Sequence, residues 1–298
     1  MSKFTFGVTY ARPKVGKTVA MLKAFPDGLF VAPRGSLLSS SYLGWDPTVL
    51  ETGPKVGVKQ IIEVIKKKSK DYPAIIIDDF SLIADAELAE CKRTNQGWSA
   101  FDVFNSRIYE LRDAARNADC HVFLTMHEQP PREVKKPGQT RWIPGGPLIG
   151  GWQLPEKLPA MCDFVARVVY DEEAIGPWKF IYQTGPDPEY ITGDRLCVMP
   201  EQFPLNIREV LLAGGYHVPR PEKLAWMDDE VESLSQELSG ELAKEQPNSK
   251  PIIAGRSADL VKSVTDERHI RWVVSDALAR AQLRQHRSNL LNDFVESF

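Results

Sequence analysis

The chain has 298 residues, of which 43% are hydrophobic and 26% charged, and its formal net charge is −3. This is the profile of a soluble globular protein, and the length fits one large α/β domain with an appendage or two small domains. The net charge gives no global attraction to nucleic acid, and no stretch is apolar enough for a membrane-spanning helix. The four cysteines form no CxxC pair, and this absence argues against a zinc site. We therefore expect a cytoplasmic protein without a membrane partner.

The first two thirds of the chain alternate between strand and helix patterns. Strands are predicted at residues 3–10, 28–32, 74–77 and 121–126, and helices at residues 18–24, 58–69, 81–92 and 99–117. Fully apolar runs such as 74–77 are typical of the central strands of a parallel sheet. Two later strands, at 164–170 and 179–183, are expected to be antiparallel at a sheet edge. The alternation predicts a mostly parallel, doubly wound α/β sheet.

The composition changes after Pro221, where the sequence becomes acidic, polar and helix-prone. We expect a nucleotide-binding core over residues 1–222, an acidic polar segment and linker over 223–256, and a helical C-terminal extension over 257–298. The extension carries arginines beside acidic residues, so a solvated face or an oligomer contact is favoured there over a second DNA site.

A phosphate-binding motif follows the first predicted strand. Residues 11–18 match the pattern [AG]-x4-G-K-[ST], in which backbone N–H groups and a helix N-terminus surround phosphates. Gly16 allows close approach, Lys17 reaches the β- and γ-phosphates, and the Thr18 hydroxyl binds Mg²⁺. The expected cofactors are therefore ATP and Mg²⁺, and the alternative is an ordinary strand–turn–helix junction. The expected nucleotide contacts come from Ala11, Arg12, Pro13, Lys14, Val15, Gly16, Lys17, Thr18 and Val19.

Two carboxylates follow the apolar strand at 74–77. Asp78 has the position of a Walker B residue, which would place its carboxylate beside Mg²⁺ together with Thr18. Alternatively, Asp78 only caps the next helix. Asp79 is predicted either to position the attacking water or to cap the helix that begins at Ser81.

With these motifs placed, the chain resembles the RecA-like P-loop ATPases that phages and bacteria encode near recombination genes. The resemblance covers roughly residues 3–220 and rests on the following segments: 11–18, 75–79, 122–128, 158–164 and 193–195. It implies a RecA-like P-loop NTPase core, and an ATPase of recombination or single-strand annealing. It further implies a homo-oligomer, a ring or a filament, that binds single-stranded DNA, with a single-strand-binding protein as a further partner. The location would be the bacterial host cytoplasm if a phage encodes the protein.

The resemblance also assigns roles to single residues. His127 ends a strand near the γ-phosphate and would act as a sensor, although a histidine there can also be a satisfied polar group. Arg195 would reach across a subunit boundary as an arginine finger, with a surface ion pair as the alternative. Arg34 stands where these ATPases usually carry a catalytic glutamate, which predicts slow hydrolysis with Asp79 as the substitute. The expected catalytic residues are Lys17, Asp78, Asp79, His127 and Arg195.

A long loop is predicted over residues 128–155. It contains more cations than acids, together with Trp142 and Trp152, and this composition suits single-strand binding. The alternative is a mobile surface flap whose tryptophans pack on the core. The predicted nucleic-acid contacts are Arg132, Lys135, Lys136, Arg141 and Trp142.

Three functions remain open from the sequence. The first is a recombination or annealing ATPase that acts on single-stranded DNA. The second is a nucleotide-regulated assembly or structural protein that does not contact DNA, and the third is a replication accessory protein such as a helicase loader. Stimulation of ATP turnover by single-stranded DNA separates the first function from the second.

Overall fold

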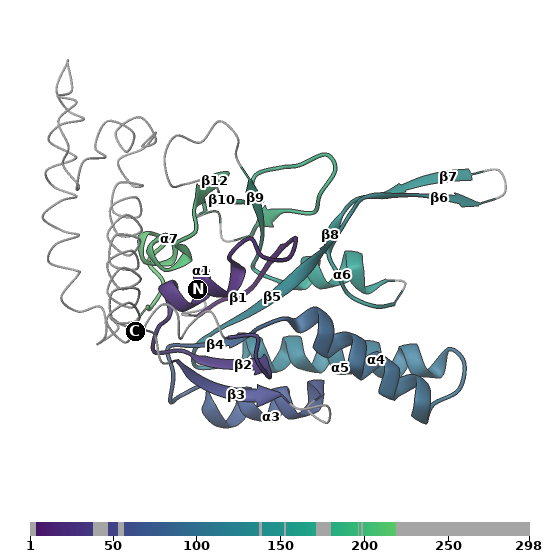
Figure 1. Cartoon of the computed structure of the whole chain (residues 1–298), viewed down its shortest axis with the longest axis horizontal. Coiled ribbons are helices and arrows are strands. Elements are labelled where there is room, and N and C mark those ends of the chain that lie inside the picture. The colour runs from purple at the N-terminus through teal and green to yellow at the C-terminus, as the bar shows by residue number, and fades with distance from the viewer. Residues whose placement is uncertain are drawn as a thin grey trace, which may run out of the picture.

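The computed structural model of the chain describes residues 4–37, 47–52, 57–136, 139–151, 153–170, 180–195, 197 and 199–218 (Figure 1). It covers the greater part of the predicted core. The predicted acidic segment at 223–256 and the predicted helical extension at 257–298 lie outside the described residues and stay predictions.

A single mixed sheet forms the centre of the fold. Its main path runs in the order β12 (Gln202–Pro204), β10 (Phe180–Gln183), β9 (Phe164–Tyr170), β1 (Phe6–Ala11), β5 (His121–Gln129), β4 (Ala74–Ile77), β2 (Leu29–Pro33) and β3 (Thr48–Thr52). All neighbours from β9 to β3 are parallel, whereas β10 is antiparallel to both β9 and β12. The prediction of a mostly parallel α/β sheet is confirmed. The antiparallel prediction holds for β10 and for the pairing of β9 with β10. On its other side β9 pairs in parallel with β1, so it is not the edge strand that was expected.

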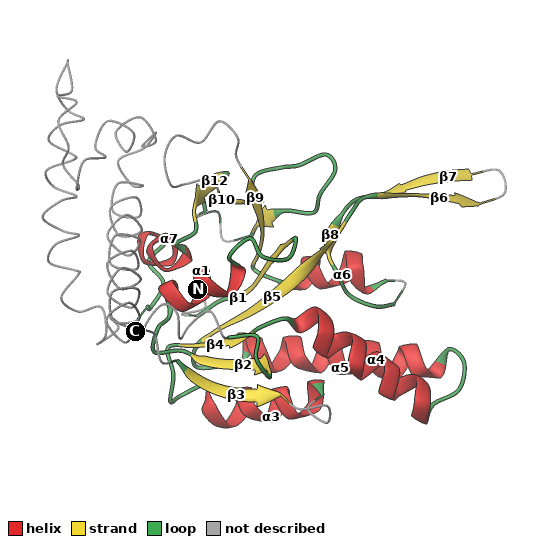
Figure 2. Cartoon of the chain, in the orientation of Figure 1, coloured by secondary structure: helices red, strands yellow, loops and turns green. Residues whose placement is uncertain are grey.

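Helices cover both faces of the sheet (Figure 2). On one face lie α3 (Val58–Lys68), α4 (Phe80–Thr94) and α5 (Ser99–Arg116), and on the other lie α1 (Lys17–Ala24) and α7 (Ile207–Ala213). In α3 the apolar stripe of Val58, Ile61, Ile62 and Ile65 is buried and the lysines near its end face solvent, as the spacing predicts. Within the described residues, no helix is both long enough and apolar enough to cross a membrane.

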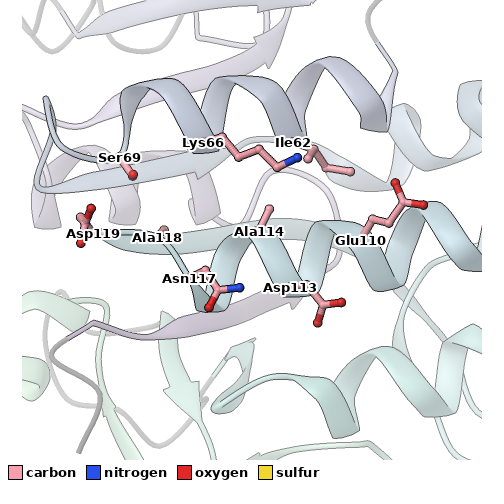
Figure 3. Close-up of a pocket in the computed structure, with 9 residues that line it drawn as sticks. All are labelled: Ile62, Lys66, Ser69, Glu110, Asp113, Ala114, Asn117, Ala118 and Asp119. Carbon is pink, nitrogen blue, oxygen red and sulfur yellow. The ribbon is translucent and has the colours of Figure 1, made fainter.

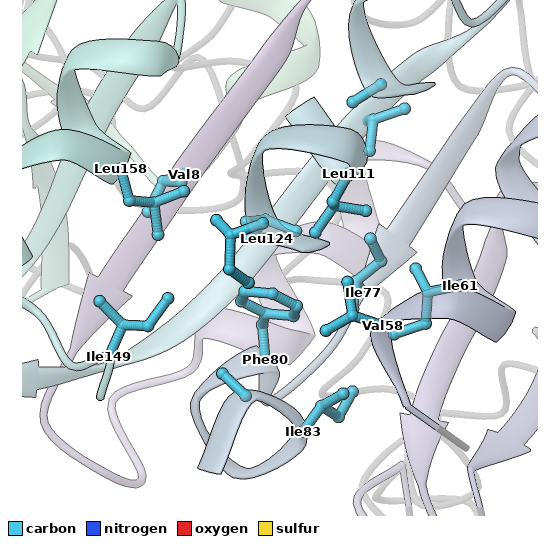
Figure 4. Packing of buried hydrophobic residues seen from close by; sticks show 14 of the residues in the cluster. Val8, Val58, Ile61, Ile77, Phe80, Ile83, Leu111, Leu124, Ile149 and Leu158 are labelled. Carbon is cyan, nitrogen blue, oxygen red and sulfur yellow. The ribbon is translucent and has the colours of Figure 1, made fainter. Parts of the chain in front are cut away.

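Each face of the sheet carries its own hydrophobic cluster. Because side chains alternate along a strand, β1 sends Phe6, Val8 and Tyr10 into the cluster beneath α3, α4 and α5. Figure 4 shows the Phe80 ring in that cluster, among aliphatic side chains from the strands and helices. On the opposite face a Cβ atom at Gly7 would lie 2.2 Å from the Phe164 ring, so the pairing of β1 with β9 requires glycine at this position.

The segment predicted as a loop at 128–155 is largely regular structure. After β5 the chain forms an antiparallel hairpin of β6 (Arg132–Lys136) and β7 (Gln139–Ile143), which projects away from the body of the molecule (Figure 1). It returns through β8 (Gly146–Pro147), which pairs with the end of β5, and then enters α6 (Leu154–Met161). The loop prediction is therefore wrong, because cross-strand pairing satisfies the backbone groups of this segment.

Candidate nucleotide-binding site

Three neighbouring strands deliver the predicted site residues to one edge of the sheet. The phosphate-binding motif follows β1, His127 lies near the end of β5, and Asp78 follows β4. Since β5 lies between β1 and β4, the three strand ends lie side by side, with the end of β5 in the middle. This edge, at the carboxyl ends of the parallel strands, is where open α/β sheets bind ligands.

The phosphate loop has a backbone shaped for an anion. Lys14 and Gly16 have positive φ angles of 66° and 92°, and helix α1 begins directly after Gly16. No side chain caps that helix, so its first N–H groups remain available to phosphate oxygens. The Lys17 ammonium group donates to the carbonyl oxygens of Ala11, at 3.2 Å, and Arg12, at 3.0 Å, which holds it under the loop.

Acidic side chains surround this ammonium group. Burial lowers the pKa of Lys17, while the nearby charges of Asp78, Asp79 and Glu128 act in the opposite direction. The chain thus holds a partly desolvated cation next to carboxylates, and the phosphates of a nucleotide would supply further negative charge at this position.

Asp78 and Thr18 face each other in a buried pocket of polar groups. The Thr18 hydroxyl lies 2.9 Å and 3.1 Å from the two Asp78 carboxylate oxygens, and the Thr125 hydroxyl donates to Asp78 Oδ1 at 2.6 Å. Asp78 is 3% exposed, and this burial raises the pKa of its carboxyl group, although the hydrogen bonds from Thr125 and Thr18 partly oppose the shift. A strand-end aspartate that only caps a helix would not make these contacts.

The oxygen atoms at this point fit Mg²⁺. A hydroxyl and a carboxylate are hard oxygen ligands, and Mg²⁺ typically takes one or two protein ligands and completes its shell with phosphate oxygens and water. Within the described ranges no group of three or more His, Cys, Asp or Glu residues could hold a metal by itself. The protein therefore provides part of a Mg²⁺ site, which a bound nucleotide would complete.

Asp79 and His127 form a second pair at the same edge. The Asp79 Oδ1 atom lies 2.8 Å from Nε2 of His127, and the Asp79 backbone N–H donates to the Thr125 hydroxyl at 3.0 Å. Asp79 has a left-handed backbone with φ 53° and ψ 44°, which is uncommon for a residue other than glycine and is found at functional turns. It is the N-cap residue of α4, but its side chain makes no capping hydrogen bond with that helix.

A set of contacts beside the loop was missed by sequence reasoning. Glu128, counted from the sequence as an acid of the long loop, lies instead at the phosphate loop, with Oε1 3.6 Å from Arg12 Nε. Its other oxygen lies 2.8 Å from Arg167 Nε, and the Arg167 guanidinium lies over the Tyr190 ring at 3.2 Å from the centroid. The only sequence signal for these contacts is the position of Glu128 directly after His127, because Arg167 and Tyr190 are distant in sequence.

Two predicted residues lie away from this cluster. Arg34 follows β2, its side chain is 88% exposed, and its Nε lies 3.9 Å from Glu51 Oε2. Arg195 lies beside Asp163, whose N–H donates to the carbonyl of Phe6 at the start of β1. Since the phosphate loop follows the other end of β1, Arg195 does not reach the loop of its own chain. Its predicted role toward a neighbouring subunit stays a prediction.

The predicted nucleic-acid contacts lie on the projecting hairpin. Trp142 pairs with Glu133 in the register and its residue is 52% exposed, so it does not pack on the core as the flap alternative requires. Arg132 is exposed as well. Positions 135, 136 and 141 lie on the two hairpin strands, but their side chains, like Trp152, lie outside the described structure.

The hollow between α3 and α5 is separate from this site. It has a volume of about 360 Å³ and is lined by residues that include Lys66, Glu110 and Asp113 (Figure 3). Asp119, which also lines it, shortly precedes β5, so the hollow lies toward the amino ends of the strands. It therefore faces away from the edge that carries the phosphate loop.

The phosphate loop, the Thr18–Asp78 pair and their place on a parallel sheet define a P-loop NTPase. The family described as "AAA domain" matches residues 4–196, and the chain belongs to this family. Membership implies binding of a nucleotide and usually of Mg²⁺. No curated protein matches the chain. Among solved structures it is similar to a KaiC-like protein from the hyperthermophilic archaeon Pyrococcus horikoshii, with 14% identity, coverage of 67% of this chain and 84% of that chain, and a TM-score of 0.39.

Proposed function

We propose that this protein is a slowly hydrolysing ATPase that binds single-stranded DNA with its β6–β7 hairpin and supports recombination or annealing. The observation that carries the proposal is the course of β5. This strand places His127 beside Asp79 at the nucleotide site, and within a few residues the chain enters the hairpin. Nucleotide and DNA would thus contact two ends of one continuous segment.

The composition of the hairpin suits a single strand of DNA. Cations at Arg132, Lys135, Lys136 and Arg141 provide charge for phosphates, and the exposed Trp142 ring provides a surface on which a base can stack. Stacking of this kind tolerates any sequence, because every base has a π-face. The hairpin projects from the body, so a strand can reach it without displacing the core (Figure 1).

Slow hydrolysis follows from the side chains around the phosphates. Bound Mg²⁺ would neutralise charge on the phosphate oxygens, and Lys17 adds a second positive charge there. Orientation of the attacking water is left to Asp79, whose Oδ1 atom lies 2.8 Å from His127 Nε2. Arg34 cannot accept a hydrogen bond from water, and its exposed side chain lies toward Glu51. The ATP-bound state would therefore be long-lived, and nucleotide binding would act as the switch.

Assembly into a ring or filament forms part of the same proposal. Arg195 lies away from the phosphate loop of its own chain, so an arginine-finger role would require a neighbouring subunit whose loop it approaches. A single-strand-binding protein that shares the DNA would be a further partner.

The decisive experiment combines ATPase assays and DNA titrations over a range of salt concentrations. Joint neutralisation of Lys135, Lys136 and Arg141 should lower the slope of log affinity against log salt by about 2, at roughly 0.7 per phosphate contact. Trp142→Ala should cost about 1–3 kcal/mol of binding free energy if a base stacks there. The matched control is neutralisation of the solvated lysines on α3, at positions 66, 67 and 68, which should change neither slope nor affinity.

The same titrations separate the alternatives. An unchanged slope in the triple variant would show that the hairpin is not the DNA contact. ATP binding without any DNA binding, and without stimulation of turnover by single-stranded DNA, would favour the nucleotide-regulated assembly protein.

A further inference from the structure

Ser81 occupies a buried position between the nucleotide site and the hairpin. It lies in the first turn of α4, just after the Asp78–Asp79 turn, and it is 1% exposed. Its hydroxyl oxygen accepts a hydrogen bond from the His127 backbone N–H at 3.0 Å and donates one to the Leu148 carbonyl at 2.7 Å. Ser81 thus contacts two segments that are far apart in sequence.

These two segments are the strands that lead into and out of the hairpin. His127 belongs to the outgoing strand β5, and Leu148 follows the returning strand β8. The Leu148 N–H also donates to the His127 carbonyl at 2.8 Å, which closes a ring of three hydrogen bonds between Ser81, His127 and Leu148. The hairpin root is therefore fastened to the first turn of α4 by one side chain.

The other end of this connection reaches the nucleotide site through a short stretch of backbone. Asp79, two residues before Ser81, has φ 53° and contacts the His127 ring, while Asp78 contacts Thr18. A buried hydroxyl group whose hydrogen bonds are not satisfied lowers the stability of the folded protein. Any shift of this turn on nucleotide binding must therefore either carry the hairpin root with it or break both bonds of Ser81.

We propose that Ser81 is a positioning residue that couples nucleotide occupancy at the phosphate loop to the placement of the β6–β7 hairpin. Its importance for DNA rests on the proposed function, whereas the coupling itself does not. Coupling is reciprocal, so nucleotide should tighten DNA binding by the same factor by which DNA tightens nucleotide binding, and a typical factor is about tenfold.

The test measures coupling in the full chain with a non-hydrolysable ATP analogue and a single-stranded oligonucleotide. In the wild type, the analogue should raise DNA affinity about tenfold. In Ser81→Ala this ratio should fall below about twofold, with the affinity for the analogue alone nearly unchanged. Ser81→Thr keeps the hydroxyl and should restore coupling. Ser106→Ala removes an exposed serine hydroxyl on α5 and should behave as wild type.

A second readout needs no DNA. Backbone hydrogen–deuterium exchange over residues 132–136 and 139–143 should change when the analogue binds to the wild type, and this response should be lost in Ser81→Ala. If the wild type binds no DNA but this pattern holds, the proposed function fails and the coupling stands. An equal response in wild type and Ser81→Ala overturns the coupling, as does a wild-type hairpin that does not respond. If Ser81→Ala does not fold, the wild type is titrated with the ATP analogue, and hydrogen–deuterium exchange is followed at residues 78–81 and in the hairpin. Both regions must then change with the same midpoint concentration of analogue, and two different midpoints overturn the proposal.

Discussion

The buried His121 ring should make the stability of the fold depend on pH. It accepts a hydrogen bond at Nδ1 from the Thr5 N–H at 3.2 Å, and its Nε2 lies 2.9 Å from the His217 carbonyl oxygen, to which it donates. Aromatic rings of Phe4, Phe25 and Phe123 pack around it. Burial lowers the pKa of His121 from 6.5 to about 4, since a second ring proton would be desolvated and would face an N–H donor.

The size of the effect follows from these two pKa values. The unfolded chain binds a proton as the pH falls through 6.5, whereas the folded chain binds it only near pH 4, so acidification favours unfolding across this window. Between pH 7.5 and pH 5.0 the loss amounts to about 2 kcal/mol of unfolding free energy, at about 1.4 kcal/mol per unit. Stability should be fully retained above the unfolded pKa and should decline below it.

Urea unfolding followed by tryptophan fluorescence at both pH values tests this prediction. His121→Gln, which does not titrate in this range, should lose about 2 kcal/mol less than the wild type on acidification. Equal losses in the wild type and His121→Gln would refute the reasoning.

Three other substitutions test the site and the helical layer. Lys17→Ala should abolish ATP binding at micromolar nucleotide in calorimetric titrations, and unchanged affinity would contradict the phosphate assignment. In steady-state assays Asp79→Asn should lower ATP turnover about a hundredfold while sparing ATP binding, whereas Arg34→Glu should raise turnover or leave it unchanged. A wild-type turnover near 10 per second, with Asp79→Asn equally active, would show that Asp79 is not the catalytic carboxylate. Glu87→Gln should cost about 2–3 kcal/mol in urea unfolding, because it removes the negative charge that pairs with the half-buried Arg107 of α5. The exposed Glu90→Gln should have almost no effect, and similar losses in both variants would contradict this account.

Local patterns in the sequence predict the centre of the fold and the phosphate site. The loop at 11–18 is encoded in one short segment whose residue types determine its backbone, so no distant contact is needed to predict it. The apolar runs at 74–77 and 121–126 are buried strands because only a covered sheet accommodates them. The pairing of Thr18 with Asp78 then follows from the parallel arrangement of β1, β5 and β4.

The features that sequence reasoning missed depend on distant partners or on weak local signals. Strand β3 is largely exposed at the edge of the sheet and has no apolar run. The sequence does contain a pattern typical of a hairpin, since Pro137-Gly138 stands between two short strand-prone segments. The other Pro and Gly residues around it favoured the interpretation as a loop. The contacts of Glu128 with Arg167, and of Ser81 with Leu148, join residues whose proximity only the folded sheet determines.

The paired hairpin strands give the protein a part whose length can vary independently of its core. Five register pairs join β6 to β7, and each step from one pair to the next adds about 3.4 Å, so the last pair lies roughly 14 Å from the first. Because successive residues of a strand face opposite sides, removal of one pair near the root would turn every remaining side chain of the arm to the other side. Removal of two pairs would keep the facing and shorten the arm by about 7 Å. Insertions and deletions that preserve function in this arm should therefore occur in steps of two pairs, both in natural variation and in designed variants.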